Sequence, residues 1–119
     1  VIKQILTKAY PSGKNIDDEL IEILYAPSQR KNSKEAFRGF INLFDDYLAT
    51  DLFDKIDVSI QLIWGEKDPW ESLKEAKAWK NKFKNIKRLD IVKGAGHCPH
   101  DENPEVTNKL IYKFLQDTK

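Results

Sequence analysis

Two ionisable residues of the chain follow apolar runs that stop at a glycine. Asp68 stands in LIWGEKDPW, residues 62–70, and His97 stands in GAGHCPH, residues 94–100. An aspartate that accepts a hydrogen bond from one imidazole nitrogen fixes the tautomer of the ring and leaves the other nitrogen free to act as a general base. Asp68 and His97 are therefore candidates for two members of a catalytic set, and the third member, a nucleophile, must be sought elsewhere.

The segments before these two residues are typical of buried β-strands, because they are short and rich in β-branched and aromatic side chains. Each is followed by a stretch with helical spacing of its apolar residues. Strands are expected at residues 58–64 and 86–92, and helices at residues 71–83 and 103–116. This order predicts a βαβ crossover with two parallel strands. Asp68 and His97 should then meet at the carboxyl-terminal edge of the sheet, where sites collect in open α/β folds.

The spacing of apolar residues in the first part of the chain, residues 1–48, predicts short amphipathic helices and no strand. These helices are expected at residues 1–10, 15–25 and 34–48, with Asn15 and Ser33 as N-caps of the second and third. The third carries an apolar stripe of Phe37, Phe40, Phe44 and Tyr47. Such a stripe is more often the face that holds a helix down than the wall of a substrate pocket.

Asp68 also has a simpler interpretation, as a helix cap in front of Pro69. The sequence SLKE, residues 72–75, is a capping box in its own right, so the following helix can begin at Ser72 and leave Asp68 free. An aspartate in a turn and a histidine in a loop are each common in proteins. Their matching positions after two neighbouring strands favour the interpretation as an acid and a base.

The stretches IQLIWGEKDPW and GAGHCPHDENPEVTNKLIYKFL together resemble the C-terminal portion of an α/β-hydrolase. The patterns are G-x-x-D-P after one strand and G-x-G-H-x-x-x-x-E-x-P-E before the last helix, and the likeness covers residues 56–117. The resemblance implies that Asp68 is the acid and His97 the base of a Ser-His-Asp triad, and that Glu102 braces the catalytic loop; for Glu102 the alternative is a surface charge. It also implies that residues 1–48 are the remnant of a helical cap and residues 49–119 the C-terminal part of the hydrolase core.

The nucleophile of such a triad is missing from the sequence. The family's serine stands in a G-x-S-x-G turn, and members with an aspartate nucleophile place it on the same turn. No serine here has a glycine at both positions. Ser12 is followed by Gly13, but Tyr10 occupies the place of the first glycine. Two buried parallel strands with open edges are also not a stable sheet by themselves. We therefore expect an incomplete α/β fold, the C-terminal βαβα portion of an α/β-hydrolase sheet preceded by cap-like helices, which is inactive alone.

Neighbouring residues offer weaker candidates. Cys98 is more often a small buried thiol than a nucleophile, because adjacent side chains in a loop rarely reach attacking geometry. The residues around His97 and His100 are too close in sequence for a tetrahedral metal site, so neither a metal nor another cofactor is expected. Trp70 could line the mouth of a pocket, although a packed aromatic is the commoner role.

Composition limits the partners. Lys and Arg number 20 against 19 Asp and Glu, which disfavours a nucleic-acid partner. No apolar stretch approaches the roughly 18 residues of a membrane span. A single cysteine, Cys98, favours a reducing compartment and a cytoplasmic location. The expected partner is a small-molecule, ester-like substrate of the complete esterase- or lipase-like enzyme. The alternative is a non-catalytic α/β module that forms a homo-oligomer, or binds another protein, through an exposed sheet edge.

Overall fold

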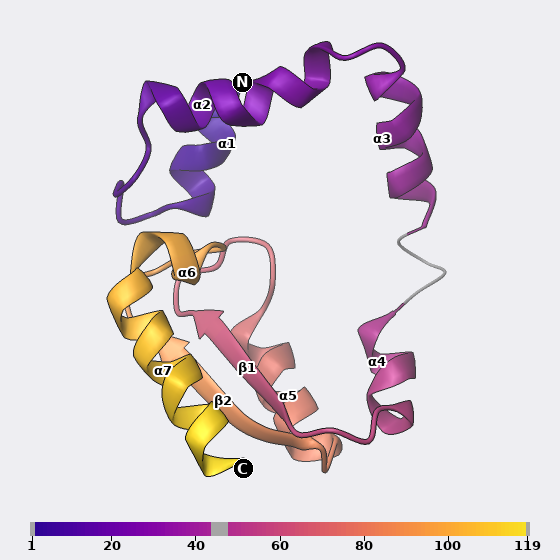
Figure 1. The fold of residues 1–119 in the computed structure, drawn as a ribbon, viewed down its shortest axis with the longest axis vertical. Helices are drawn as coiled ribbons and strands as arrows, with labels where there is room; N and C mark the ends of the chain where they lie inside the picture. Colours follow the sequence, from indigo (N-terminus) through magenta and orange to yellow (C-terminus); the bar gives the residue numbers. More distant parts are fainter. Residues whose placement is uncertain (1, 44–47, 119) are drawn as a thin grey trace.

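The computed structural model of the chain describes residues 2–43 and 48–118. Its elements, in chain order, are α1 Ile2–Ala9, α2 Asp18–Tyr25, the 3-10 helix η1 Ala26–Gln29, α3 Ser33–Asn42, α4 Ala49–Leu52, the 3-10 helix η2 Phe53–Lys55, β1 Ile60–Gly65, α5 Leu73–Lys82, β2 Ile86–Val92, α6 Pro99–Glu102 and α7 Pro104–Asp117 (Figure 1). Within the described ranges, every helix is too short or too polar to cross a bilayer.

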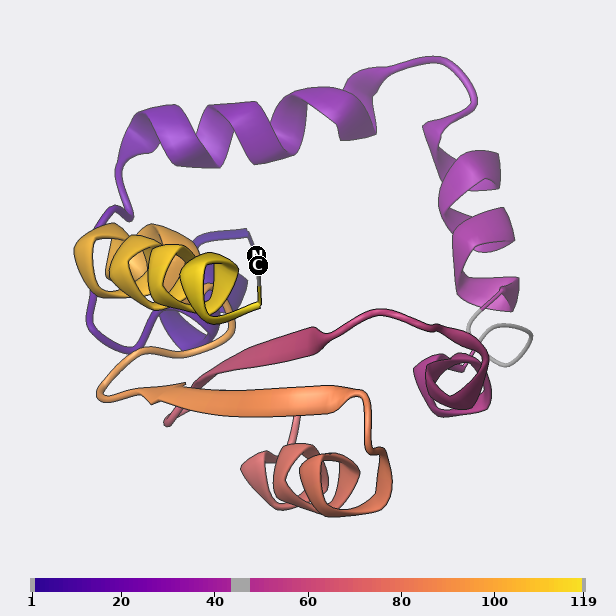
Figure 2. The ribbon, with the colours of Figure 1, turned by 60° about the horizontal axis from the view of Figure 1, so that its bottom comes forward.

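The two strands form a parallel, two-stranded sheet, which confirms the predicted crossover. Leu62 lies opposite Leu89 and Gly65 opposite Val92, with one irregularity in the register after Ile60. Helix α5 connects the strands on one face of the sheet, and α7 lies on the other face (Figure 2). Both strands therefore deliver their carboxyl ends to the same edge.

The helices around the sheet begin where the sequence predicts. Ser72 is the N-cap of α5, and its hydroxyl accepts a hydrogen bond from the N–H of Lys74 at 3.2 Å. Asn103 is the N-cap of α7, and its side chain accepts from the N–H of Val106 at 3.3 Å. Pro104 then occupies the first helical position, where the missing N–H costs nothing.

Two predicted caps in the first part of the chain are wrong. The N-cap of α2 is Asp17, whereas Asn15 adopts a left-handed backbone conformation with φ of 61°. Asparagine tolerates this conformation, and the Asn15 side chain is used elsewhere. The N-cap of α3 is Asn32, because Ser33 is already helical and its hydroxyl donates to the carbonyl of Ser28 at 2.7 Å.

The described part of the third helix ends at Asn42, short of the expected end at residue 48. Leu48 is already in extended backbone, as the N-cap of α4. Phe44 and Tyr47, two members of the expected apolar stripe, lie outside the described residues. The other two, Phe37 and Phe40, are 63% and 57% exposed, so the described part of the stripe is not a packed face.

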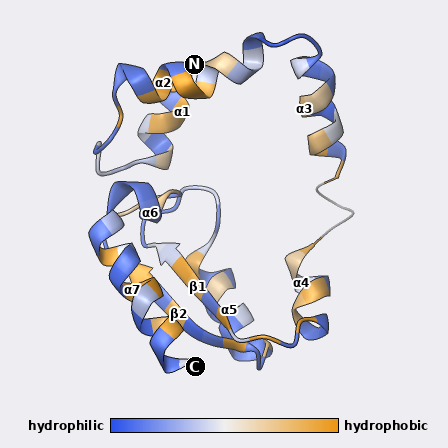
Figure 3. Ribbon diagram, in the orientation of Figure 1, coloured by the Kyte–Doolittle hydropathy of each residue, from blue (hydrophilic) through white to orange (hydrophobic). Residues whose placement is uncertain are grey.

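Among the described residues, two small clusters of buried apolar side chains stand out. One joins α1 to the loop after β2 through Leu6, Ala9 and Tyr10, and the other packs Phe53 and Phe83 under the sheet. The strands, expected to be buried on both faces, are mostly half-buried. Apolar side chains also remain exposed on α2, α3 and α7, and Figure 3 shows hydrophobic positions on these helices as well as on the strands.

The first part of the chain lies beyond the carboxyl ends of the strands. Helix α1 lies on the side of α6 at this edge and α2 lies beyond α1, whereas α3 stands away from the sheet (Figure 1). Hydrogen bonds join residues 9–15 to residues 96–102, which comprise the end of the loop after β2, called the histidine loop below, and α6. The division at residue 48 into a cap and a core stays a prediction, and residues 9–15 contact the second part of the chain directly.

Candidate active site

The loops that follow β1 and β2 lie against each other at the carboxyl-terminal edge of the sheet. The N–H of Lys67 donates to the carbonyl of Ala95 at 2.8 Å. Gly65 permits this approach, because a Cβ atom on residue 65 would lie 1.8 Å from the carbonyl oxygen of Gly96. The glycine that ends the first strand is therefore required for the two loops to meet.

This contact brings Asp68 and His97 together. Nδ1 of His97 lies 3.0 Å from Oδ2 and 3.2 Å from Oδ1 of Asp68. The Asp68 side chain is 7% exposed and the His97 side chain 41% exposed. Because an ionised carboxylate only accepts hydrogen bonds, this geometry assigns the proton of the neutral ring to Nδ1. The lone pair of Nε2 is then available for proton transfer.

The turn after β1 holds the Asp68 carboxylate in place. Its Oδ1 accepts hydrogen bonds from the N–H groups of Trp70 and Glu71 at 3.0 and 3.1 Å. Burial by itself would raise the pKa of Asp68, but these two donors and the His97 ring hold the pKa below its usual value. Ser72 caps α5, as predicted, yet Asp68 is not free of the turn. The Asp68 carboxylate accepts hydrogen bonds within the turn and from His97 at the same time.

Trp70 packs against the imidazole. The ring centroids of Trp70 and His97 are 4.8 Å apart at an interplanar angle of 77°, an edge-to-face arrangement. Trp70 is 49% exposed, so it is not the interior aromatic that was the commoner expectation. The indole covers one side of the ring and leaves part of it open to solvent.

Glu102 lies behind the histidine loop and is buried, with 3% of its surface exposed. One carboxylate oxygen accepts a hydrogen bond from the N–H of Gly96. The other accepts from the N–H and the hydroxyl of Ser12, at 3.1 and 2.5 Å. The bracing position implied by the resemblance is thus observed, and the alternative of a surface charge is wrong.

Sequence reasoning missed the residues that reach this loop from the first part of the chain. The Tyr10 hydroxyl donates to Oδ2 of Asp101 at 2.9 Å, and the Asn15 side chain donates to the carbonyl of Asp101 at 2.5 Å. Burial, followed by contacts with Cys98 and Asp101, raises the pKa of Tyr10 well above its usual value, so its hydroxyl remains a donor. The motif YPSG, residues 10–13, predicts only a turn. It gives no sign of the partners of Tyr10 and Ser12, because these lie about 90 residues away in the sequence.

The weaker candidates do not join the pair. Cys98 is partly buried against the cluster of Leu6, Ala9 and Tyr10, and His100 is exposed. In residues 2–43 and 48–118, no three His, Cys, Asp or Glu side chains are grouped so that they could hold a metal ion.

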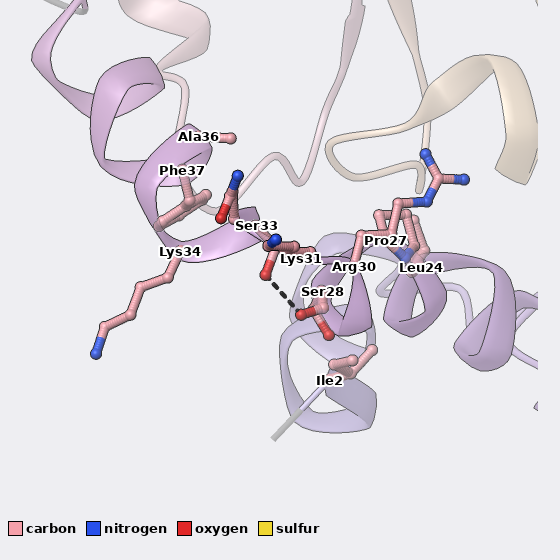
Figure 4. A pocket seen from close by; sticks show the side chains of 11 residues that line it. Ile2, Leu24, Pro27, Ser28, Arg30, Lys31, Ser33, Lys34, Ala36 and Phe37 are labelled. Carbon is pink, nitrogen blue, oxygen red and sulfur yellow. Dashed lines mark hydrogen bonds between the residues drawn. The ribbon is translucent and has the colours of Figure 1, made fainter.

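A hollow of about 850 Å³ opens between η1, α3 and the start of α1 (Figure 4). Its lining includes apolar Leu24, Pro27 and Phe37 and the cationic Arg30 and Lys34. Neither member of the Asp–His pair lines it, so its size has no bearing on that site.

A sheet that brings an aspartate and a histidine together at its carboxyl-terminal edge is a common arrangement in hydrolytic enzymes of the α/β class. About half of this chain is similar to enzymes named epoxide hydrolase and pheophytinase. Human epoxide hydrolase 4 is 38% identical over 56 residues, 47% of this chain and 16% of that protein. Pheophytinase, chloroplastic, from Arabidopsis thaliana is 44% identical over 60 residues, 50% of this chain and 12% of that protein.

A further relative, epoxide hydrolase 4 of Mus musculus, is 34% identical over 56 residues, 47% of this chain and 16% of its own length. The similarity thus covers less than a fifth of the length of these relatives. No protein-family model and no solved structure matches the chain.

Proposed function

We propose that this chain carries the acid and the base of an α/β-hydrolase active site, as the C-terminal part of that fold. The geometry of His97 carries the proposal. Its Nδ1 lies 3.0 Å from Asp68, while Nε2 has no hydrogen-bond partner among the described residues and its side chain is 41% exposed. An imidazole oriented on one side and open on the other is suited to general base catalysis. The partial similarity to hydrolases supports the same class.

In the proposed reaction a serine attacks the carbonyl carbon of a small ester. Nε2 of His97 takes the proton from the serine hydroxyl as the new C–O bond forms, and the imidazolium returns it to the departing alcohol. Water then repeats the sequence on the acyl-enzyme, and the free acid leaves. Asp68 remains ionised throughout, keeps the proton of the neutral ring on Nδ1, and stabilises the imidazolium.

The serine of this reaction belongs to a segment outside residues 1–119, because no serine in the sequence has the G-x-S-x-G environment. The first part of the chain, residues 1–48, would belong to a helical cap over the substrate. We expect the chain by itself to hydrolyse p-nitrophenyl acetate no faster than free imidazole does. Turnover by the isolated chain that disappears in His97→Ala would contradict the need for an outside nucleophile.

A chimera tests whether His97 acts as the base when a nucleophile is present. The segment of Arabidopsis pheophytinase that matches this chain is replaced by residues 56–117, and the reaction of the parent enzyme is measured. His97→Ala should lower the rate by about a thousandfold or more, because base and orientation are lost together. His100→Ala is the matched control, since this second, exposed histidine lies three residues further on, in α6. Equal rates for His97→Ala and His100→Ala would refute the assignment.

A second candidate function is favoured by the open edges of the sheet. In the described residues β1 pairs only with β2, so each strand has one edge without a partner. Apolar Ile111 and Leu115 of α7 are 39% and 55% exposed. Such surfaces can pair two copies of a chain into a homo-oligomer. A monomer in light scattering, with a single cooperative melt, would count against this module.

A further inference from the structure

A turn in the first part of the chain contacts the histidine loop at both of its ends. At one end, the carbonyl of Ala9 accepts the N–H of His97 at 2.8 Å. At the other end, Tyr10 and Asn15 bind Asp101 through its carboxylate and its carbonyl. Residues 9–15 therefore clamp residues 96–102, the end of the histidine loop and α6, although the two segments are far apart in sequence.

The centre of this clamp is the carboxylate of Glu102. A buried carboxylate is costly unless donors surround it. No cation forms an ion pair with it within the described residues, so hydrogen bonds must stabilise it. Ser12 supplies two of its three hydrogen-bond donors, one from the backbone and one from the hydroxyl, and Gly96 supplies the third. Such charge-assisted bonds are about twice as strong as neutral ones, so Ser12 is the main neighbour that holds Glu102 in place.

The clamp acts on the backbone next to the catalytic ring. The N–H of Gly96 is held by Glu102 and the following N–H, of His97, by the carbonyl of Ala9. Residue 96 has no room for a side chain, because a Cβ atom there would lie 2.2 Å from the Ala9 oxygen and 2.3 Å from Cδ of Pro11. Two consecutive peptide groups are thus fixed against the turn.

The ring itself has few contacts to fix it. Its side chain is 41% exposed and touches Asp68 and Trp70, and Trp70 is itself half exposed. An exposed side chain loses rotamer freedom when it is ordered, and one hydrogen bond near the surface barely repays that cost. The anchored backbone must therefore supply most of the orientation that keeps Nδ1 on the carboxylate.

We propose that Ser12 is a positioning residue. Through Glu102 and Gly96 it holds the His97 ring in the orientation in which Nδ1 donates a hydrogen bond to Asp68. The serine that lacks the environment of a nucleophile thus serves the acid–base pair indirectly. Its importance for catalysis rests on the proposed function, whereas its effect on the ring can be measured without any reaction. The first part of the chain then contributes to the chemistry as well as to a substrate cap.

The test is nitrogen NMR of the imidazoles in the full chain, with Ser12→Ala compared with wild type. The chain has two histidines, so His100→Gln assigns the signals. Wild type should show the neutral His97 ring with its proton on Nδ1. In Ser12→Ala we expect a mixture of both tautomers and exchange of the Gly96 amide hydrogen about tenfold faster, because Glu102 has lost one donor.

Two further variants separate positioning from general damage. Ser12→Thr keeps a hydroxyl and should restore the wild-type tautomer. Ser28→Ala removes another serine hydroxyl of the first part, which donates to the carbonyl of Tyr25 at 2.7 Å, and should leave His97 unchanged. An unchanged tautomer and unchanged Gly96 exchange in Ser12→Ala would overturn the proposal, as would an equal effect of Ser28→Ala.

The result is distinct from the test of the proposed function. A chimera in which His97→Ala has no effect would refute the hydrolase assignment and leave the tautomer shift in Ser12→Ala intact. A chimera that depends on His97, together with an unchanged tautomer in Ser12→Ala, would refute the positioning role alone.

Discussion

Replacing Gly65 by alanine should separate the two loops that carry the site. The new Cβ atom would lie 1.8 Å from the carbonyl oxygen of Gly96 and 2.7 Å from that of Ala95. Both are backbone atoms, so no change of rotamer relieves the clash. Ordinary van der Waals contact begins at 3.4 Å, and the difference from 1.8 Å means that the end of β1 and the histidine loop must move apart by about 1.6 Å.

The expected loss of stability follows from the hydrogen bonds that this movement breaks. The hydrogen bond from Lys67 to Ala95, 2.8 Å long, and the bond from Glu66 to Val92, 3.0 Å long, both cross the same gap. Each is worth about 1 kcal/mol, and strain in an overpacked site adds about 1–3 kcal/mol. We expect Gly65→Ala to lower the free energy of unfolding by about 3–5 kcal/mol.

Urea unfolding followed by tryptophan fluorescence measures this loss, and the Nδ1 proton signal of His97 reports whether the ring still meets Asp68. The control is Gly39→Ala in α3, where an added Cβ has nothing within 4 Å. Alanine there should stabilise the helix by up to about 1 kcal/mol. If Gly65→Ala unfolds at the wild-type urea concentration and keeps the His97 signal, the loops do not meet as described.

Two further predictions concern charge and capping. Because the pKa of Asp68 is lower in the folded chain than in the unfolded one, its charge stabilises the fold above the unfolded pKa of about 3.9, and this contribution is lost as the pH falls through the folded pKa. Asp68→Asn should therefore lower the free energy of unfolding by about 1 kcal/mol near pH 7 and by progressively less below pH 4, as measured by urea titrations. A difference between variant and wild type that stays constant at all pH values would contradict this. Asn103→Ala should lower the free energy of unfolding by about 1 kcal/mol, because it removes the cap of α7. Asn108→Ala, inside the same helix, should not lower it. Equal losses of stability in the two variants would argue against the cap.

Much of the arrangement around the sheet could be predicted from local patterns. The second strand, residues 86–92, and the cap of α7 at Asn103 were placed correctly, and β1 begins two residues later than expected. A short β-branched run or a cap followed by proline depends on neighbours within a few residues, so the sequence records it directly. The proximity of Asp68 and His97 followed from topology, because parallel neighbouring strands end at one edge.

Other features depended on distant partners. Asn15 fits the pattern of a helix cap, but its side chain bonds to Asp101, and Asp17 caps the helix instead. Trp70 could have packed inside and instead lies half exposed against His97. In each case two local conformations are close in energy, so a single tertiary contact decides between them.

The sequence by itself determined the residue types of the pair, the parallel crossover that unites them, and the glycine at the end of the first strand. Each follows from spacing along the chain and from steric rules that act locally. Only the tertiary structure showed that Asp68 closes its own turn while it holds His97, and that Ser12 supports the buried Glu102. Hydrogen bonds between residues about 90 positions apart leave no periodic signal, since any polar side chain in a turn could have made them.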